Sequence, residues 1–239
     1  MDQTSDSSES GDTIEVVVVR VFTNESGRNG NELGIVRSTP ATSAREQEIA
    51  TALGFSETVF LDAVHQAERA AHIRIFTPAK ELPFAGHPSV GTAWWLADRR
   101  TPVDVLREAA GDVEVTVDDD TAWITARPEW TPSFDWLPLA SPADVEALDP
   151  FAFPTGQHYA YAWIDEDAGR LRARMFAPEM GIVEDEATGA AAISLTARLG
   201  RPLRILQGEG SELVTELLAD GRIRVGGTTV YDRTIEATL

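Results

Sequence analysis

Three side chains that can exchange protons stand at the ends of predicted elements: Glu57, His87 and Asp185. Glu57 comes at the start of a predicted strand, and His87 and Asp185 each come just before a predicted helix. A carboxylate in a cleft without solvent has a raised pKa, so it can take a proton from carbon and return it elsewhere. These residues are the candidate catalytic group. Each also has a structural alternative. Glu57 can be a solvated loop carboxylate, His87 a packing or capping histidine, and Asp185 a charge at a helix N-terminus.

Small residues mark the starts of the same two helices. A helix N-terminus presents unpaired N–H groups and a partial positive charge, which together bind a carboxylate without any lysine or arginine. The candidate substrate-binding residues at these starts are Gly86, Ser89, Thr188, Gly189 and Ala190. The alternative is that glycine and alanine at these positions only permit tight packing of a central helix.

Other classes of active site find no support in the sequence. The chain has no cysteine, which excludes disulfides, zinc–thiolate sites and thiol catalysis. The motifs of serine hydrolases, P-loop NTPases and zinc metalloproteases are absent, and residues 27–34 do not match the dinucleotide-binding glycine pattern. The remaining histidines, His65, His72 and His158, lack metal-ligand spacing, so we expect no metal site.

The charge balance argues against two kinds of partner. Acidic residues outnumber basic ones 39 to 20, for a net charge of -19, which repels nucleic acid and anionic membranes. Only one basic residue, Lys80, is a lysine. An acidic surface nearly free of lysine suits a cytoplasm at high salt, and the alternative is a GC-rich genome that encodes arginine in place of lysine. We expect a cytoplasmic protein, because residues 1–13 resemble no signal peptide and no apolar stretch approaches membrane-spanning length.

Hydrophobic patterning predicts strands and helices in two similar series. The first series has strands at 14–22, 33–36, 58–64, 71–76, 103–107, 113–117 and 122–125, a helix capped by Thr42 or Ser43, and an apolar helix over 88–97. A proline-rich crossover follows at 128–138. The second series has strands at 159–164, 171–176, near 203, and at 212–218, 223–225 and 230–235, with a helix over 187–199.

The two series share letters as well as order. Residues 74–78 (RIFTP) are similar to residues 174–178 (RMFAP), and residues 86–89 align with residues 185–188. This repeat predicts an α/β (α+β) fold of two pseudosymmetric halves, each a curled sheet or barrel around one central helix, with the helix N-termini facing across a cleft. The expected boundaries are a disordered acidic tail at 1–12, a first half at 13–128 closed by a strand at 228–239, and a second half at 129–227.

At this point the sequence resembles a known family, the PhzF-like (phenazine-biosynthesis) isomerases with the diaminopimelate-epimerase fold. The resemblance covers nearly the whole chain from Thr13. It rests on Phe22-Thr23 with Gly30-Asn31, on SETVF at 56–60, on ELPFAGHP at 81–88 after the RIFTP segment, on Gly181-Ile182, Glu184-Asp185 and ATG at 187–189 after RMFAP, and on Gly226-Gly227.

The resemblance implies a cofactor-free isomerase, usually a homodimer, with its site between the halves. Glu57 resembles the family's proton-transferring residue, His87 and Asp185 its assisting groups, and Asn31 a residue that holds substrate. In the related two-thiol racemases, two cysteines stand near the positions that correspond to Gly86 and Asp185. This chain has no cysteine.

The chain also departs from the family pattern. Glu32 and Glu186 stand where proline is frequent, and the chain is shorter than typical members. Since the missing length falls in loops that define the substrate, the resemblance does not specify the substrate.

The sequence thus predicts an isomerase that moves a proton between carbons of a small molecule, either zwitterionic or a plain carboxylate. Two alternatives stay open. One is a non-catalytic binding protein on the same fold, which the joint presence of Glu57, His87 and Asp185 disfavours. The other is a lyase that uses the same base.

If the acidic excess is an adaptation to salt, the thermal unfolding midpoint should rise between dilute buffer and molar KCl. The screening length falls from about 30 Å at 0.01 M to about 3 Å at 1 M, which removes repulsion among carboxylates. Scanning calorimetry at both salt concentrations measures the shift. An unchanged midpoint would favour the GC-bias explanation.

Overall fold

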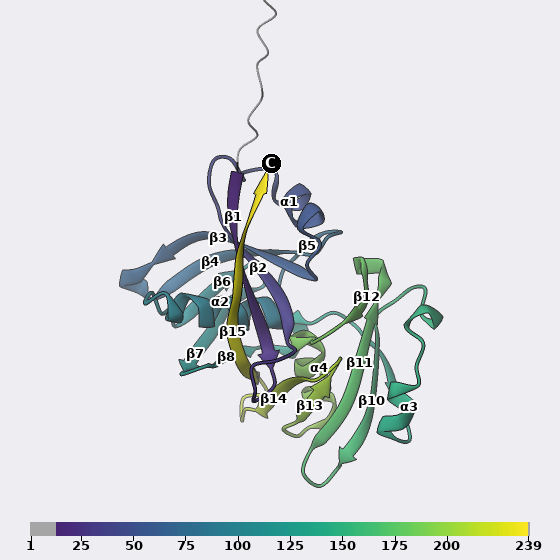
Figure 1. Ribbon diagram of the computed structural model, residues 1–239. Coiled ribbons are helices and arrows are strands. Elements are labelled where there is room, and N and C mark those ends of the chain that lie inside the picture. The colour runs from purple at the N-terminus through teal and green to yellow at the C-terminus, as the bar shows by residue number, and fades with distance from the viewer. Residues whose placement is uncertain (1–12, 239) are drawn as a thin grey trace, which may run out of the picture.

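Residues 13–238 of the computed structural model form two joined halves (Figure 1). The first half is a closed barrel of eight strands in the order β1-β2-β3-β4-β6-β7-β8-β15, which closes because β15 also pairs with β1. These strands are β1 (Thr13–Thr23), β2 (Asn31–Arg37), β3 (Glu57–His65), β4 (Ala70–Phe76), β6 (Val105–Glu108), β7 (Gly111–Asp118), β8 (Thr121–Ala126) and β15 (Ile223–Thr238). Pairs β2–β3 and β4–β6 are parallel, and the others are antiparallel.

The valine run of β1 is buried on both faces. Val17 and Val19 belong to the barrel core, whereas Val16 belongs to a separate hydrophobic cluster that includes Ile49 of α1 (Glu46–Leu53). A strand covered on both faces has no polar alternation, which explains its continuous β-branched sequence.

The barrel encloses α2 (Gly86–Asp98), as the apolar sequence of this helix predicts. Residues 86–96 are all buried, so the helix has no solvent face before the half-buried Ala97. It begins two residues earlier than the expected start at Pro88, which lies within its first turn.

The second half is an open curled sheet that continues from β15 in the order β14-β13-β11-β10-β9. Its strands are β14 (Ser211–Leu217), β13 (Arg204–Gln207), β11 (Arg170–Ala177), β10 (His158–Asp165) and β9 (Asp135–Pro138). The helix α4 (Gly189–Leu199) packs on β14 and β15. Short α3 (Pro142–Glu146) covers β10 and β11. The 3-10 turns are η1 (Gln66–Glu68), η2 (Pro128–Trp130), η3 (Pro150–Ala152) and η4 (Pro178–Met180).

The two halves repeat one arrangement, as the sequence repeat predicts. The two-residue β5 (Glu81–Leu82) pairs with β4 and leads to α2, and β12 (Ile182–Asp185) pairs with β11 and leads to α4. Parallel pairing of β4 with β6 matches parallel pairing of β11 with β13.

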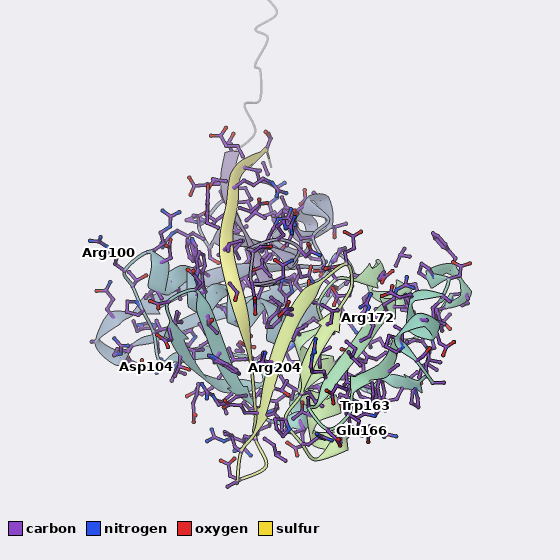
Figure 2. The ribbon with its side chains drawn as sticks, turned by 60° about the horizontal axis from the view of Figure 1, so that its bottom comes forward. Arg100, Asp104, Trp163, Glu166, Arg172 and Arg204 are labelled. Carbon is purple, nitrogen blue, oxygen red and sulfur yellow. The ribbon has the colours of Figure 1, made fainter. Side chains whose placement is uncertain are left out.

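Arg172 fastens the second half internally (Figure 2). Its side chain is buried and donates to the carbonyl oxygens of Leu206 and Gly208, while its Nε lies 2.5 Å from Glu146 Oε1. One guanidinium therefore connects β11 with the end of β13 and with α3.

The strand β15 joins the halves. Its first residues pair with both β8 and β14, and from Thr228 onward it pairs with β1 (Figure 1). The expectation of two separate strands, 223–225 and 230–235, is wrong. Gly226 and Gly227 lie within this strand. Both positions need glycine, because an ideal Cβ would lie only 2.4 Å from the ring of Trp123 at Gly226 and 2.7 Å from the ring of Phe22 at Gly227.

A second local expectation is also wrong. Neither Thr42 nor Ser43 caps α1, whose N-cap is Arg45. The Thr42 hydroxyl instead accepts from the backbone N–H of Thr39 and closes a turn before the helix. The predicted C-terminal stop at Gly54 is confirmed, with φ at 70°.

Two further points concern the chain as a whole. The division at residues 128 and 129 stays a prediction, since β15 belongs to both sheets, and the predicted tail at 1–12 lies outside the described residues. Within residues 13–238, no helix is both long enough and apolar enough to span a bilayer.

The N-termini of α2 and α4 meet backbone to backbone. A Cβ on Gly86 would lie 2.8 Å from the Gly189 carbonyl carbon, and a Cβ on Gly189 would lie 2.9 Å from the Gly86 Cα. The sequence repeat aligns Gly86 with Asp185, whereas in the structure Gly86 contacts Gly189. Only glycine at both positions permits this approach.

We expect Gly189→Ala to lower the free energy of unfolding by about 1–3 kcal/mol, because backbone atoms cannot yield as a flexible side chain would. In an unobstructed helix the same change would stabilise, by about 1 kcal/mol. Urea denaturation measures the sign. Ser194→Ala, on the same helix, is the control and should be close to neutral. A Gly189→Ala variant more stable than the native chain would contradict the contact.

Candidate active site

Glu57 and His87 form a buried pair. Glu57 is the first residue of β3, His87 lies in the first turn of α2, and their exposed fractions are 8% and 2%. His87 Nδ1 lies 3.0 Å from Glu57 Oε2, so an Nδ1–H donates to the carboxylate. The other ring nitrogen, Nε2, is buried and has no hydrogen-bond partner among residues 13–238. The histidine therefore holds one oxygen of Glu57 and leaves the other free to act.

Asp185 ends β12 and is held by two donors. Asn31 Nδ2 donates to Oδ1 and Thr188 Oγ1 donates to Oδ2, each at 2.6 Å. The side-chain oxygen of Asn31, Oδ1, in turn accepts from Ser56 Oγ at 3.1 Å. Burial, followed by the charge of Glu57, raises the pKa of Asp185 to about 7, although Thr188 and Asn31 oppose the shift. This carboxyl can therefore gain or lose a proton near neutral pH.

A buried amide fixes the segment that carries Asp185. Gln207 Nε2 donates to the Asp185 carbonyl oxygen at 2.9 Å and to Thr188 Oγ1 at 2.8 Å. Its Oε1 accepts from the Thr188 N–H and from the Tyr159 hydroxyl. Burial and the charge of Asp185 raise the pKa of Tyr159, which stays a neutral donor. The sequence analysis missed both residues, and neither stands in a motif that would have marked it.

Four backbone N–H groups at the helix junction come before the first hydrogen bonds of their helices. Those of Gly86, His87, Gly189 and Ala190 have no acceptor among the described residues, and of these four residues only Ala190 lines the cavity at the junction. The first bond of α4 runs from the Ala192 N–H to the Thr188 carbonyl oxygen. The two helices thus bring unpaired donors of opposite halves to one place.

A cavity of about 210 Å³ opens on this junction. Four of the predicted residues line it, namely Glu57, Asp185, Thr188 and Ala190. The walls that the sequence analysis missed are mostly apolar: Leu82, Pro83, Phe84, Ala85, Trp130, Pro132, Phe134, Met175, Ala177, Met180 and Ile182, with Lys80, Thr131 and Gln157 as polar members. The proline-rich crossover supplies Trp130 and Phe134 to the pocket wall. It is not wholly irregular as the sequence predicted, since it contains η2 and the short strand β9.

The other predicted residues lie around this cavity in different ways. The backbone of Gly86, His87 and Gly189 forms the helix junction, and Asn31 reaches Asp185 from a neighbouring cleft of about 480 Å³. Ser89 is not brought to the cavity. Its Oγ lies 2.7 Å from the Ala85 carbonyl oxygen and 2.6 Å from Glu108 Oε1.

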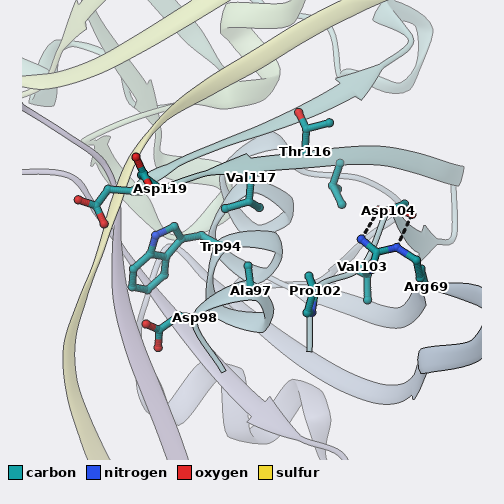
Figure 3. A pocket seen from close by; sticks show the side chains of 12 residues that line it. Arg69, Trp94, Ala97, Asp98, Pro102, Val103, Asp104, Thr116, Val117 and Asp119 are labelled. Carbon is teal, nitrogen blue, oxygen red and sulfur yellow. Dashed lines mark hydrogen bonds and ion pairs between the residues drawn. The ribbon is translucent and has the colours of Figure 1, made fainter. Parts of the chain in front are cut away.

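A different hollow, of about 450 Å³, lies at the other end of α2 (Figure 3). Its lining includes Trp94, Asp98, Asp119 and the ion pair of Arg69 with Asp104. None of the predicted site residues lines it, and the acid–base groups lie at the opposite helix end. We therefore assign the site to the smaller cavity.

The two glutamates that depart from the family pattern both have partners. Glu32 lies 2.5 Å from Arg20 and 3.1 Å from Arg233. Glu186 accepts from Ser211 Oγ and from the Glu209 N–H. Glu32 thus links β2 to β1 and β15, and Glu186 links the segment after Asp185 to the start of β14.

No group of three or more histidine, aspartate or glutamate side chains within residues 13–238 is arranged to hold a metal ion. The acid–base groups are instead engaged with one another and with neutral donors.

The chain as a whole is similar to known proteins. The family model described as "Phenazine biosynthesis-like protein" (PhzC-PhzF) matches residues 19–148 and 137–228. A trans-2,3-dihydro-3-hydroxyanthranilate isomerase from Pseudomonas aeruginosa is 31% identical over 207 residues, which cover 71% of this chain and 74% of the relative. The same enzyme of Pseudomonas fluorescens is 31% identical over 215 residues, with 69% and 75% covered.

Solved structures share the fold. A Bacillus anthracis protein of the PhzF family superposes with a TM-score of 0.74 at 21% identity, over 95% of this chain and all of that one. A hydroxyproline epimerase from Agrobacterium vitis superposes with a TM-score of 0.62 at 12% identity, over 95% and 93% of the two chains. At these identities the likeness concerns the fold alone.

The Glu108 carboxyl near the site should make stability depend on pH. Burial raises the pKa of Glu108 to about 8, and one Ser89 hydroxyl hydrogen cannot serve two acceptors. Protonated Glu108 therefore donates to Ser89, which donates to Ala85. Since the folded pKa is raised, this contribution is complete below the unfolded pKa, about 4.5, and is lost as the pH rises through about 8.

Glu108→Gln keeps a donor toward Ser89 but cannot ionise. We expect its stability relative to the native chain to increase with pH between about 4.5 and 8. Urea denaturation across this range measures the difference, with the substitution of an exposed glutamate, Glu129→Gln, as the control. A constant difference for Glu108→Gln would contradict the raised pKa.

Proposed function

This chain belongs to the phenazine biosynthesis-like (PhzC-PhzF) family and is an isomerase, and we propose that Glu57 performs its proton transfer without a cofactor. The observation that carries the proposal is the buried pair of Glu57 and His87, which shares one cavity with Asp185. The activity of the relatives implies a small-molecule substrate.

The proposed reaction is a shift of a proton along an unsaturated carbon skeleton. The free oxygen of Glu57 takes a proton from one carbon, the electrons of that C–H bond move the double bond, and Glu57 returns the proton to another carbon. Atoms and electrons balance without an oxidant or reductant. His87 donates its Nδ1–H to the second oxygen and keeps the carboxylate oriented between the two steps.

Asp185 has a different task in this proposal. Its pKa of about 7 suits a group that exchanges a proton with a heteroatom of the substrate or accepts from an amino group. Asn31 and Thr188 fix both of its oxygens, so its orientation does not depend on the substrate.

The proposed substrate is a ring-bearing amino carboxylate or plain carboxylate. The unpaired N–H groups of Gly86, Gly189 and Ala190 favour a carboxylate, and the aromatic side chains of Phe84 and Trp130, 5.7 Å apart at their ring centres, favour an apolar ring. The relatives' substrate, trans-2,3-dihydro-3-hydroxyanthranilate, is the first candidate. The sequence-based hypothesis that Ser89 contacts substrate is not supported, because the Ser89 hydroxyl is hydrogen-bonded to Glu108.

A homodimer remains an expectation from the family. Two-thiol racemisation, the chemistry that the resemblance associates with related epimerases, is not available to a chain without cysteine. A lyase reaction would use the same base, and the mass of the product separates it from isomerisation.

Glu57→Gln should reduce turnover by at least about 100-fold while ligand binding stays nearly intact, because the amide keeps the size but cannot accept the proton. Mass spectrometry of deuterium incorporated from D₂O into trans-2,3-dihydro-3-hydroxyanthranilate or another accepted substrate measures the step. The exposed Glu129→Gln serves as control and should keep full activity. Native-like turnover by Glu57→Gln would refute the mechanism, and a product lighter by one water would indicate a lyase.

A further inference from the structure

The single lysine of the chain lies at the candidate active site. All other basic residues are arginines, nineteen of the twenty, yet Lys80 is the one that lines the cavity together with Glu57 and Asp185. Lysine is a flexible point charge, whereas arginine presents a planar fork that suits fixed ion pairs. A lone lysine in this position can therefore move its charge to contact a ligand.

The main chain that carries Lys80 is tightly held. The buried Thr77 hydroxyl accepts from the Ala79 and Lys80 N–H groups, and the Thr77 N–H donates to the Lys80 carbonyl oxygen at 2.9 Å. From α1, Gln47 and Thr51 donate to the carbonyl oxygens of this turn. The side chain thus starts from a fixed point beside the cavity.

The side chain of Lys80 is exposed at the edge of the cavity, and its ammonium has no ion pair or hydrogen-bond partner among residues 13–238. The arginines that precede the two turns differ in this respect. Arg74 binds Glu46 and Asp62, and Arg174 binds Glu184. The charge of Lys80 is therefore not neutralised by a neighbour and stays available to an anion.

The repeat makes the position of Lys80 more informative. Since residues 74–78 answer residues 174–178, Lys80 corresponds to Met180, and both line the same cavity from opposite halves. One wall thus presents a cation where the equivalent wall presents a thioether. This difference breaks the symmetry of the cavity and can fix which way a substrate enters.

Two carboxyl groups line the same cavity. An anionic group of a ligand would be repelled by Glu57 and Asp185, except at the unpaired helix N–H groups. Lys80 supplies the second place where a negative charge is stabilised. The cavity therefore has two anion-binding positions, with apolar and aromatic side chains among its walls.

We propose that Lys80 binds a second anionic group of a ligand, so that the cavity favours a ring-bearing dianion, with one carboxylate at the helix N-termini and another acidic group at Lys80, over a ligand with a single carboxylate such as the relatives' substrate. This inference rests on the proposed function for the location of the site. It adds a specificity-determining residue and a substrate class that the relatives' names do not state.

The test compares isophthalate, a ring with two carboxylates, with benzoate, which has one. In the native chain, isothermal titration should show isophthalate binding at least 10-fold more tightly. Lys80→Met, which copies the equivalent residue Met180, should abolish that preference, and Lys80→Arg should retain most of it. Arg204→Met, which removes an exposed positive charge outside the cavity lining, should leave the preference unchanged.

The uniqueness of Lys80 gives a second readout. Reductive methylation with ¹³C-formaldehyde keeps the charge and labels only Lys80 and the terminal amine. The Lys80 signal should shift with isophthalate and much less with benzoate. No preference for isophthalate in the native chain, including no binding of either probe at millimolar concentration, would overturn the proposal, as would a preference that survives in Lys80→Met.

The failure of this inference is distinguishable from failure of the proposed function. Glu57→Gln should keep the isophthalate preference, because it does not alter Lys80. Loss of turnover in Glu57→Gln together with an unchanged preference in Lys80→Met would refute only the role of Lys80. Full turnover in Glu57→Gln would refute the proton-transfer mechanism whatever the probes do.

Discussion

The contact between Gly86 and Gly189 is the constraint on which the rest of the site depends. It brings two helix N-termini together, each with a partial positive charge of about half a unit. Two such ends repel one another unless negative charge lies beside them. Asp185 supplies part of that compensation, and a bound carboxylate would supply more. The architecture therefore favours an anion at the same point where it exposes unpaired N–H groups.

The strands explain how this unfavourable contact is maintained. The closed barrel surrounds α2, the open sheet packs on α4, and β15 belongs to both sheets. The two helices cannot separate without disturbing the pairing of β15 with β8 and β14. Because the second sheet stays open, the crossover with Trp130 and Phe134 can reach the junction and form part of the cavity wall.

The proposed chemistry depends on differences between two similar halves. The first half contributes the Glu57–His87 pair. The second half contributes Asp185, which is held by Thr188 of the same half and by Asn31 of the first half. Burial raises the pKa of Asp185. A symmetric scaffold with unlike acids on its two sides gives a substrate two different faces, which directional proton transfer requires.

The sequence by itself determined the local elements and the residues that begin them. The RIFTP and RMFAP repeat, the apolar helix predicted at 88–97 and the three candidate acid–base residues all follow from patterns within a few positions. Only the tertiary structure decided the partners. Gln207 and Tyr159 secure the Asp185 segment, Ser89 bonds toward Glu108, and β15 runs unbroken through two glycines. These contacts join residues 19 to 48 positions apart or depend on rings from distant strands, so strand register and packing set them, and no local pattern encodes them.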